Sequence, residues 1–256
     1  MAKDKVILIT GASSGIGRAL ALALAAPETT LLLTGRNAAK LDETARLCRA
    51  KGATAETSVI PVTDRAAFEK QVLDWDNARG IDVVIANAGV SGGTSMDDAQ
   101  NEAQLREIFD INLTGTFNTV NPLIPRFQTR KSGHIVLMSS MAGFRGMPNA
   151  PAYSTSKVAV RAYGDALRPL LKKDGVTVST IFPGFIKTPM TDVNNFKMPF
   201  LMDVDKAAEI IKRGIDGKKA AIAFPWQMHA FCWLLGALPR RLGDWILSHA
   251  PQKPPR

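Results

Sequence analysis

A tyrosine and a lysine one helical turn apart are the side chains in this sequence best suited to chemistry. Tyr153 and Lys157 bound the segment YSTSK, and residues four apart on a helix face the same side. A phenol has a pKa of about 10, too high for easy proton exchange at neutral pH. A neighbouring ammonium favours the phenolate and so lowers that pKa. The pair could therefore act as a general acid and base.

A glycine-rich turn near the start of the chain could bind phosphate. The segment 10–18 reads TGASSGIGR and follows a short apolar run. Gly11 permits a tight bend, Gly15 lets the backbone approach a pyrophosphate, and Gly17 lets the next helix pack closely. The pyrophosphate then accepts from free N–H groups at the helix N-terminus. The sequence thus predicts a dinucleotide site over Gly11, Ser13, Ser14, Gly15, Ile16 and Gly17.

The end of the second apolar run indicates which dinucleotide binds. An acid there accepts from the ribose 2′-OH of NAD, whereas an arginine accommodates the 2′-phosphate of NADP. Here the segment 33–37 reads LTGRN and holds no acid. Gly35 leaves room, and Arg36 offers a planar fork suited to phosphate. We expect NADP (NADPH/NADP+) rather than NAD; the alternative is an exposed arginine without a ligand.

Alternating strands and helices must position these residues. We predict strands over 5–10, 29–34, 53–62, 81–86, 134–139, 177–182 and 220–224. We predict helices over 15–26, 38–51, 65–77, 102–127, 153–173 and 205–217, with Pro122 and Pro125 bending or ending the fourth. This pattern favours an α/β fold, a doubly wound, mostly parallel seven-stranded sheet with helices on both faces. No linker or repeat divides residues 1–256, so we expect one domain.

Further motifs make the pattern specific. The chain has ANAG at 86–89 after the fourth strand, YSTSK at 153–157, and FPG at 182–184 after the sixth strand. With the TGxxxGxG turn, it resembles the short-chain dehydrogenase/reductase family, in the single-domain branch of about this length, over roughly residues 5–225. The resemblance implies a Rossmann-like oxidoreductase that binds a nicotinamide dinucleotide.

The resemblance also assigns catalytic roles by position. The family's tyrosine and lysine match Tyr153 and Lys157, and its serine, thirteen positions before the tyrosine, matches Ser140. Its asparagine, in the helix after the fourth strand, matches Asn112. Tyr153 would then protonate the developing alkoxide, while Ser140 orients the substrate oxygen. Lys157 would also donate to the nicotinamide ribose, and Asn112 would hold a water that links Lys157 to solvent. No metal is required for this chemistry.

The remaining cofactor contacts carry over with two departures. The family often has Asn where this chain has Ala86, and often has an adenine-binding Asp where it has Pro61. Adenine recognition would then rest on the backbone near Val62 or on an apolar slot. Thr188 matches the family's threonine that holds the carboxamide. Beyond the glycine-rich turn, the expected cofactor contacts are Arg36, Val62, Asn87, Ala88, Gly89, Tyr153, Lys157, Pro183, Gly184, Ile186 and Thr188.

These residues predict an NADPH-dependent oxidoreductase that interconverts a ketone or aldehyde and an alcohol by hydride transfer and tyrosine-mediated proton transfer. One alternative is a catalytically silent NADP-binding regulator or scaffold, which the intact Ser140, Tyr153 and Lys157 argue against. Another is an NAD-preferring alcohol dehydrogenase. A nucleotide-sugar epimerase would need a larger substrate domain than this chain offers.

Two apolar segments concern the substrate. We expect a lid over about 188–204, rich in Met and Phe, and hence an apolar substrate contacted also by Phe144, Met147 and Phe185. The alternative is a lid packed on its own core. An apolar C-terminal extension over about 226–250 holds three of the four tryptophans and an arginine pair. We expect it to cover the pocket or form a subunit interface, because Pro239 and Gly243 break it into short pieces. Contact with an anionic membrane surface is the less favoured alternative.

Composition and charge restrict which partners, metal sites and cellular location we expect for this chain. The net charge of +9 comes from dispersed basic residues without a nucleic-acid motif, so we expect no nucleic-acid partner. Cys48 and Cys232 lack CxxC spacing, which argues against a zinc site or a disulfide scaffold. We see no leader peptide and no long apolar run, so we expect a cytoplasmic protein, with peripheral membrane contact left open. In the family, long helices such as 102–127 and 153–173 pair across two-fold axes, which implies a homodimer or homotetramer.

Overall fold

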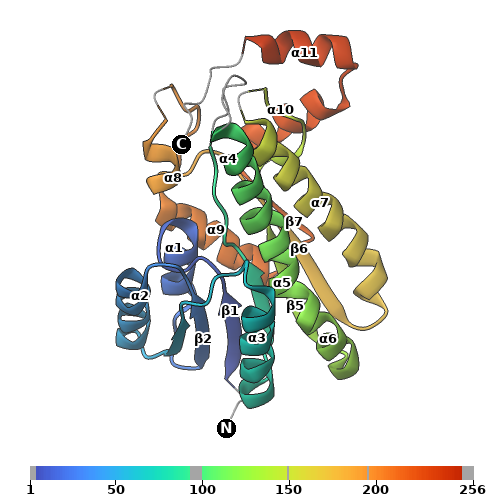
Figure 1. Ribbon diagram of the computed structural model, residues 1–256. Helices are drawn as coiled ribbons and strands as arrows, with labels where there is room; N and C mark the ends of the chain where they lie inside the picture. Colours follow the sequence, from blue (N-terminus) through green and yellow to red (C-terminus); the bar gives the residue numbers. More distant parts are fainter. Residues whose placement is uncertain (1–3, 93–99, 149, 195, 250–256) are drawn as a thin grey trace.

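Seven parallel strands form one sheet in the computed structural model, which describes residues 4–92, 100–148, 150–194 and 196–249 (Figure 1). The spatial order is β3-β2-β1-β4-β5-β6-β7. Their bounds are β1 Lys5–Ile9, β2 Thr29–Thr34, β3 Thr54–Ser58, β4 Val83–Ala86, β5 Gly133–Met138, β6 Val176–Pro183 and β7 Ala221–Phe224. All six pairings are parallel, which confirms the predicted doubly wound fold. The order reverses between β1 and β4, where such sheets bind ligands beyond the carboxyl ends of their strands.

Helices cover both faces of the sheet because the strands are apolar on both sides. One face packs on α1 (Gly15–Leu24), α2 (Ala38–Ala50) and α9 (Val204–Asp216), with Leu20, Leu41 and Ile211 fully buried. The other packs on α3 (Arg65–Arg79), α6 (Ile124–Arg130) and α7 (Pro151–Lys172), with Phe68, Phe127 and Val160 fully buried. Such burial of strands on both faces is typical of parallel sheets.

The long helix predicted over 102–127 is a broken series. It consists of α4 (Gln100–Phe109), a π-helical turn (Asp110–Thr114), α5 (Gly115–Val120), a 3₁₀ turn (Asn121–Leu123) and α6. Pro122 lies in the 3₁₀ turn and Pro125 in the first turn of α6, as the proline positions predict. The π-helical turn had no sequence signal, and it places Asn112 in the interior.

The sequence prediction differs from the structure by four residues at the end of the third strand, and it places a break inside the C-terminal extension, at Gly243, where there is none. The third strand ends at Ser58, not at residue 62, because its partner β2 ends opposite at Thr34 and Pro61 has no N–H to donate. The C-terminal extension forms α10 (Trp226–Ala237) and α11 (Arg240–Ser248), separated at Pro239 as expected. Gly243 lies inside α11 and does not break it. A Cβ at this position would overlap the Arg145 guanidinium, so glycine serves a close contact there.

Candidate active site

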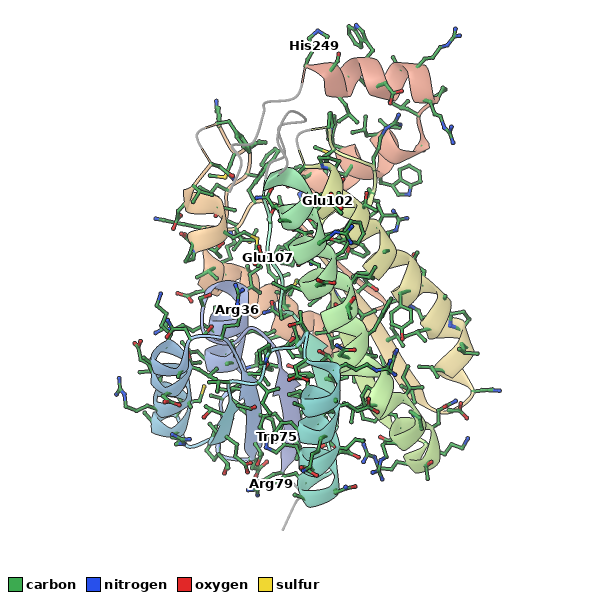
Figure 2. The ribbon with its side chains drawn as sticks, viewed as in Figure 1. Arg36, Trp75, Arg79, Glu102, Glu107 and His249 are labelled. Atoms are coloured by element: carbon green, nitrogen blue, oxygen red, sulfur yellow. The ribbon has the colours of Figure 1, made fainter. Side chains whose placement is uncertain are left out.

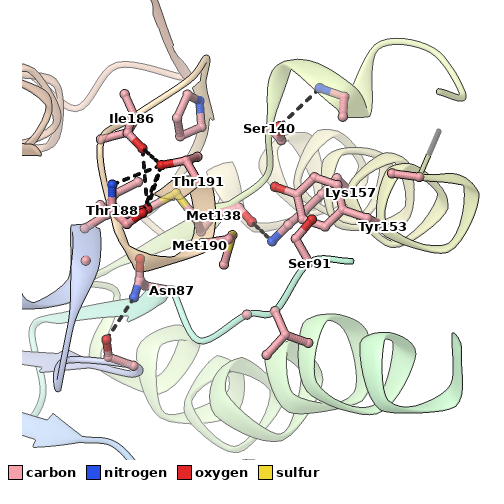
Figure 3. Close-up of a pocket in the computed structure, with 18 of the residues that line it drawn as sticks. Asn87, Ser91, Met138, Ser140, Tyr153, Lys157, Ile186, Thr188, Met190 and Thr191 are labelled. Atoms are coloured by element: carbon pink, nitrogen blue, oxygen red, sulfur yellow. Dashed lines mark hydrogen bonds between the residues drawn. The ribbon is translucent and has the colours of Figure 1, made fainter. Parts of the chain in front are cut away.

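One cavity of about 1310 Å³ lies beyond the carboxyl ends of the strands. Every cofactor and catalytic residue predicted from the sequence lines it except Asn112. Figure 3 shows how Asn87, Ser140, Tyr153, Lys157 and Thr188 gather around this cavity from separate elements. The fold thus brings together motifs that lie up to 177 positions apart, from Gly11 to Thr188.

The glycine-rich turn has the backbone that a pyrophosphate requires. Gly11 has a φ of +70°, and a Cβ there would lie 2.9 Å from the Ala88 Cα. A Cβ at Gly17 would overlap the carbonyl oxygen of Gly11. The Ser14 side chain makes no hydrogen bond to the first turn of α1. The N–H groups of that turn therefore point to the cavity without a side-chain cap, as an anion site needs.

A threonine ties the glycine-rich turn to the segment after β4. The Oγ1 of Thr10 accepts from the N–H groups of Asn87 and Ala88, each at 3.0 Å. The Asn87 side chain in turn donates to the Thr10 carbonyl at 2.8 Å. Thr10 therefore connects two segments that the sequence predicts to contact the cofactor, the glycine-rich turn and residues 87–89.

Arg36 reaches across the cavity mouth to a residue of α4. Its guanidinium lies 3.6 Å from the Glu107 carboxylate, and the two point toward each other in Figure 2. Both side chains are substantially exposed, and both line the cavity together with Lys40. Below them, the Val62 carbonyl already accepts from the Asn118 amide at 2.8 Å. Val62 lines the cavity together with Ile60 and Pro61, which is where the sequence predicts the adenine ring.

The lysine predicted to be catalytic is held from two directions. Lys157 on α7 is only 4% exposed, and its Nζ donates to the Met138 carbonyl at the end of β5, at 2.8 Å (Figure 3). The same Nζ lies 5.7 Å from the centroid of the Tyr153 ring. Ser139 Oγ donates to the Lys157 carbonyl at 2.8 Å, which fixes the helix against the strand. Lysine and tyrosine therefore face the same side of α7, as their spacing predicts.

Burial sets the protonation of this pair. It lowers the pKa of Lys157 to about 8 and raises the pKa of Tyr153, and a hydrogen bond with Ser140 acts in the opposite direction on the tyrosine. We expected the lysine ammonium to lower the phenol pKa. That expectation concerned the ammonium together with the oxidised nicotinamide; burial acts against it, because desolvation disfavours the phenolate. Ser140 is the group that favours the phenolate, and its Oγ also accepts from the Ala142 N–H at 3.1 Å.

Asn112 lies behind the cavity and not in it. Its Oδ1 accepts from the Val90 N–H at 2.8 Å, and its Nδ2 donates to the Val90 carbonyl and to Ser156 Oγ, each at 3.0 Å. The residue is fully buried. Because its side chain is engaged in this way, Asn112 positions the loop after β4 against α7. That Asn112 holds a water linking Lys157 to solvent stays a prediction.

The substrate half of the cavity is built from the predicted lid and from the C-terminal extension. Within the described lid residues, Met190, Phe196 and Pro199 line the cavity, and Phe196 stacks edge-on against Phe185 with centroids 6.0 Å apart. Met147 also lines it. Phe144 does not, because it packs between Phe182, His229 and the guanidinium of Arg161. The apolar wall is therefore as predicted except at Phe144.

The inner sides of α10 and α11 complete this wall. Cavity-lining residues of the extension recur at helical spacing: Met228, Phe231, Cys232, Leu235, Ile246, Leu247 and His249. Arg145 holds the turn between the two helices by donating to the carbonyls of Leu235 and Arg240, at 2.9 and 3.1 Å, and to Asp244 at 2.9 Å. The expectation that the extension covers the pocket agrees with this placement.

The family model for short chain dehydrogenase matches residues 5–198. The chain belongs to the short chain dehydrogenase family. An uncharacterized oxidoreductase of Myxococcus xanthus is 39% identical over 241 residues, which cover 94% of this chain and 95% of that protein. Membership in this family makes the chain an oxidoreductase by type. The alignment with the Myxococcus protein spans nearly the whole length of both chains.

Solved short-chain dehydrogenases share the architecture and hold either cofactor. One from Sphingobium yanoikuyae, in complex with NADPH, has a TM-score of 0.79 at 27% identity and covers 97% of both chains. One from Mycobacterium paratuberculosis, bound to NAD, has a TM-score of 0.75 at 28% identity, with 86% of this chain and 95% of that chain covered. These relatives therefore support a nicotinamide dinucleotide as the cofactor but do not distinguish NADPH from NAD.

Several residues that shape the cavity of this short-chain dehydrogenase were not predicted from the sequence. Thr10, Ser139 and Arg145 hold other parts of the site, and Glu107 faces Arg36. Thr10 could have been found from its place at the end of the first strand. The cavity face of α10 could have been found from the i, i+3, i+4, i+7 spacing of Met228, Phe231, Cys232 and Leu235. Glu107 and Arg145 gave no local signal.

Proposed function

We propose that this chain is an NADPH-dependent reductase of an apolar ketone or aldehyde, which also runs as an alcohol dehydrogenase in reverse. The observation that carries the proposal is the joining of Ser140, Tyr153 and Lys157 to the glycine-rich turn in one cavity. When bound, the dinucleotide would supply the hydride. The cradle fits it, because tight packing at Gly11 and Gly17 holds the turn against the segment after β4, and Gly15 lines the cavity without a side chain.

The chain's own residues would handle the proton. Tyr153 Oη would donate its proton to the oxygen of the carbonyl group as negative charge develops there. Ser140 would orient and stabilise the same oxygen through Oγ. Lys157 would leave the Met138 carbonyl for the ribose hydroxyls and favour the phenolate left on Tyr153. In reverse, the phenolate would take the proton of the alcohol.

Arg36 supports the choice of NADPH. Its guanidinium stands at the cavity mouth with Lys40 nearby, and a phosphate there would make stronger, charge-assisted contacts than the exposed Glu107 carboxylate does. The apolar wall from the lid and the extension supports an apolar substrate.

A homodimer or homotetramer is part of the proposal. Leu105 of α4 and Val158 and Leu170 of α7 are exposed apolar side chains on the two helices expected to pair across a two-fold axis. Light scattering at micromolar concentration should give a multiple of the chain mass. A species of one chain alone would rule out the assembly.

A substrate panel tests the proposed activity. Purified protein is mixed with NADPH or NADH and a series of ketones and aldehydes of growing apolar size, and loss of reduced-cofactor absorbance is followed. We expect turnover with NADPH that improves as apolar bulk increases. Turnover that favours NADH would make it an NAD-preferring enzyme. Tight NADPH binding without turnover on any carbonyl would favour the silent regulator.

A further inference from the structure

The outer face of the C-terminal extension is an apolar surface that the chain itself does not cover. Six large side chains of α10 and α11 are exposed: Trp226, Phe231, Trp233, Leu234, Leu242 and Trp245. The three tryptophans are 73%, 61% and 65% exposed. We call these six residues the outer face. Large apolar side chains exposed in such number on two successive helices indicate an interaction site.

Helix α10 carries apolar side chains on both its inner and its outer side, and Gln227 and His229 are its polar residues. Its inner side lines the cavity through Met228, Cys232 and Leu235. Its outer side carries Trp226, Trp233 and Leu234, and α10 holds no charged residue. A helix that is hydrophobic all round is normally buried in protein or in lipid. At 12 residues α10 is too short to cross a bilayer, and no helix in the described ranges is long and apolar enough to do so.

The charges around the outer face select its partner. Arg240 and Arg241 begin α11 and are exposed, and the sole carboxylate of the two helices, Asp244, is paired with Arg145 at 2.9 Å. Exposed tryptophans beside arginines match the headgroup layer of a membrane, where indole rings and cations both find partners. A second copy docked through a two-fold axis would instead bring both arginine pairs into one interface without a free carboxylate.

We propose that the outer face docks the protein on an anionic lipid surface. The extension lies at the end of the molecule beyond the carboxyl ends of the strands, where the lid with exposed Phe200 and Leu201 also lies (Figure 1). Phe231 belongs to both surfaces, because it is exposed and also lines the cavity. An apolar substrate dissolved in the lipid would then reach the cavity along α10 without crossing water. This docking does not depend on the choice of cofactor.

Vesicle sedimentation tests the docking. Full-length protein is centrifuged with vesicles of phosphatidylcholine alone or mixed with phosphatidylglycerol, at low and high salt. We expect sedimentation with the anionic vesicles that weakens as salt rises. A variant with Trp226→Ser, Trp233→Ser and Trp245→Ser should stay in the supernatant. Circular dichroism and turnover of a water-soluble carbonyl should match those of the wild type, since these tryptophans do not line the cavity.

Two charge variants provide a matched pair. Arg240→Gln with Arg241→Gln should weaken binding to anionic vesicles by about fivefold for each arginine. Lys218→Gln with Lys219→Gln removes the same charge next to β7, at the opposite end of the molecule, and should leave binding unchanged. If both pairs weaken binding equally, general charge and not the outer face is responsible.

Two other outcomes would overturn the proposal. The first is wild-type protein that remains in the supernatant with anionic vesicles at low salt. The second is a tryptophan variant that sediments like the wild type. If the tryptophan variant also forms a smaller oligomer by light scattering while the wild type ignores vesicles, a second copy of the chain covers the outer face.

Discussion

The two halves of the cavity are built in different ways. The half predicted to bind the cofactor, the cofactor half, is shaped mainly by backbone: glycines at close approach, N–H groups at the start of α1, and the chain after β4 that Thr10 Oγ1 holds in place. The substrate half is made of side chains from the lid, α10 and α11, most of them apolar. A backbone site fixes one ligand geometry, whereas a wall of Met, Phe and Leu can repack around several shapes.

This difference has a consequence for variation. In the cofactor half, an added methyl at Gly11 or Gly17 meets backbone atoms that cannot yield. In the substrate half, a changed side chain meets other flexible side chains. Substitutions should therefore separate into those that alter cofactor use and those that alter substrate use, with Tyr153, Ser140 and Lys157 at the boundary between the halves.

The largest effect is expected at that boundary. Tyr153→Phe keeps the ring and its packing but removes the proton donor, so kcat should fall by about 10²- to 10⁴-fold. The Kd of NADPH, measured by fluorescence titration, should change little, because the cofactor half is intact. Turnover close to that of the wild type would show that another group donates the proton.

The next effect is a pH dependence from Lys157. Its pKa of about 8 means that the ammonium is present below pH 8 and is lost as the pH rises through that value. We expect kcat/KM to fall above pH 8 by up to about tenfold per pH unit. A Lys157→Arg variant stays charged, so its profile should lack this fall even if its rate is lower. The same fall in both profiles would assign it to a different group.

Arg36→Ala should change the cofactor half alone. Loss of the charge-assisted contact to a 2′-phosphate should remove about 1–3 kcal/mol of preference for NADPH over NADH. Measurement of kcat/KM with both cofactors gives the preference directly. The KM of the carbonyl substrate serves as the control and should stay constant. An unchanged preference would leave Arg36 as a surface residue without a ligand.

Phe196→Ala should change the substrate half alone. Removal of the ring that lines the cavity beside Phe185 should lower kcat/KM for bulky apolar carbonyls by about tenfold. Small carbonyls should lose less, and the Kd of NADPH should not move. An equal loss for small and bulky substrates would mean that the lid acts through the fold and not through contact.

The smallest effect is expected at Glu107. Its carboxylate faces Arg36 at 3.6 Å and would repel a 2′-phosphate bound there. Glu107→Gln should tighten NADPH binding by about two- to fivefold, the range typical of exposed charge pairs. NADH binding should not respond, because NADH carries no phosphate at that position. Glu102→Gln, one turn away and paired with Arg106, is the matched control.

The features of the fold and the site that could be predicted from the sequence are those that depend on local patterns. Apolar runs and helical spacing gave the order of strands and helices, and the spacing of Tyr153 and Lys157 gave their common side of α7. Contacts between distant segments of the chain do not produce a recognisable sequence pattern. Nothing in the sequence showed that Val90 and Ser156 would engage the side chain of Asn112. The raised pKa of Tyr153 was missed for a similar reason, since burial depends on the whole fold.

Arg145 makes the loop after β5 and the C-terminal extension one exchangeable unit. Its guanidinium ends at carbonyls of α10 and α11, and Gly243 leaves the space for it, while the same loop begins at Ser140. A chimera that grafts only the extension of a relative would bring foreign carbonyls to this guanidinium. Grafting the loop and the extension together should preserve the contact, so the pair is the smallest part through which substrate range could be transferred between relatives.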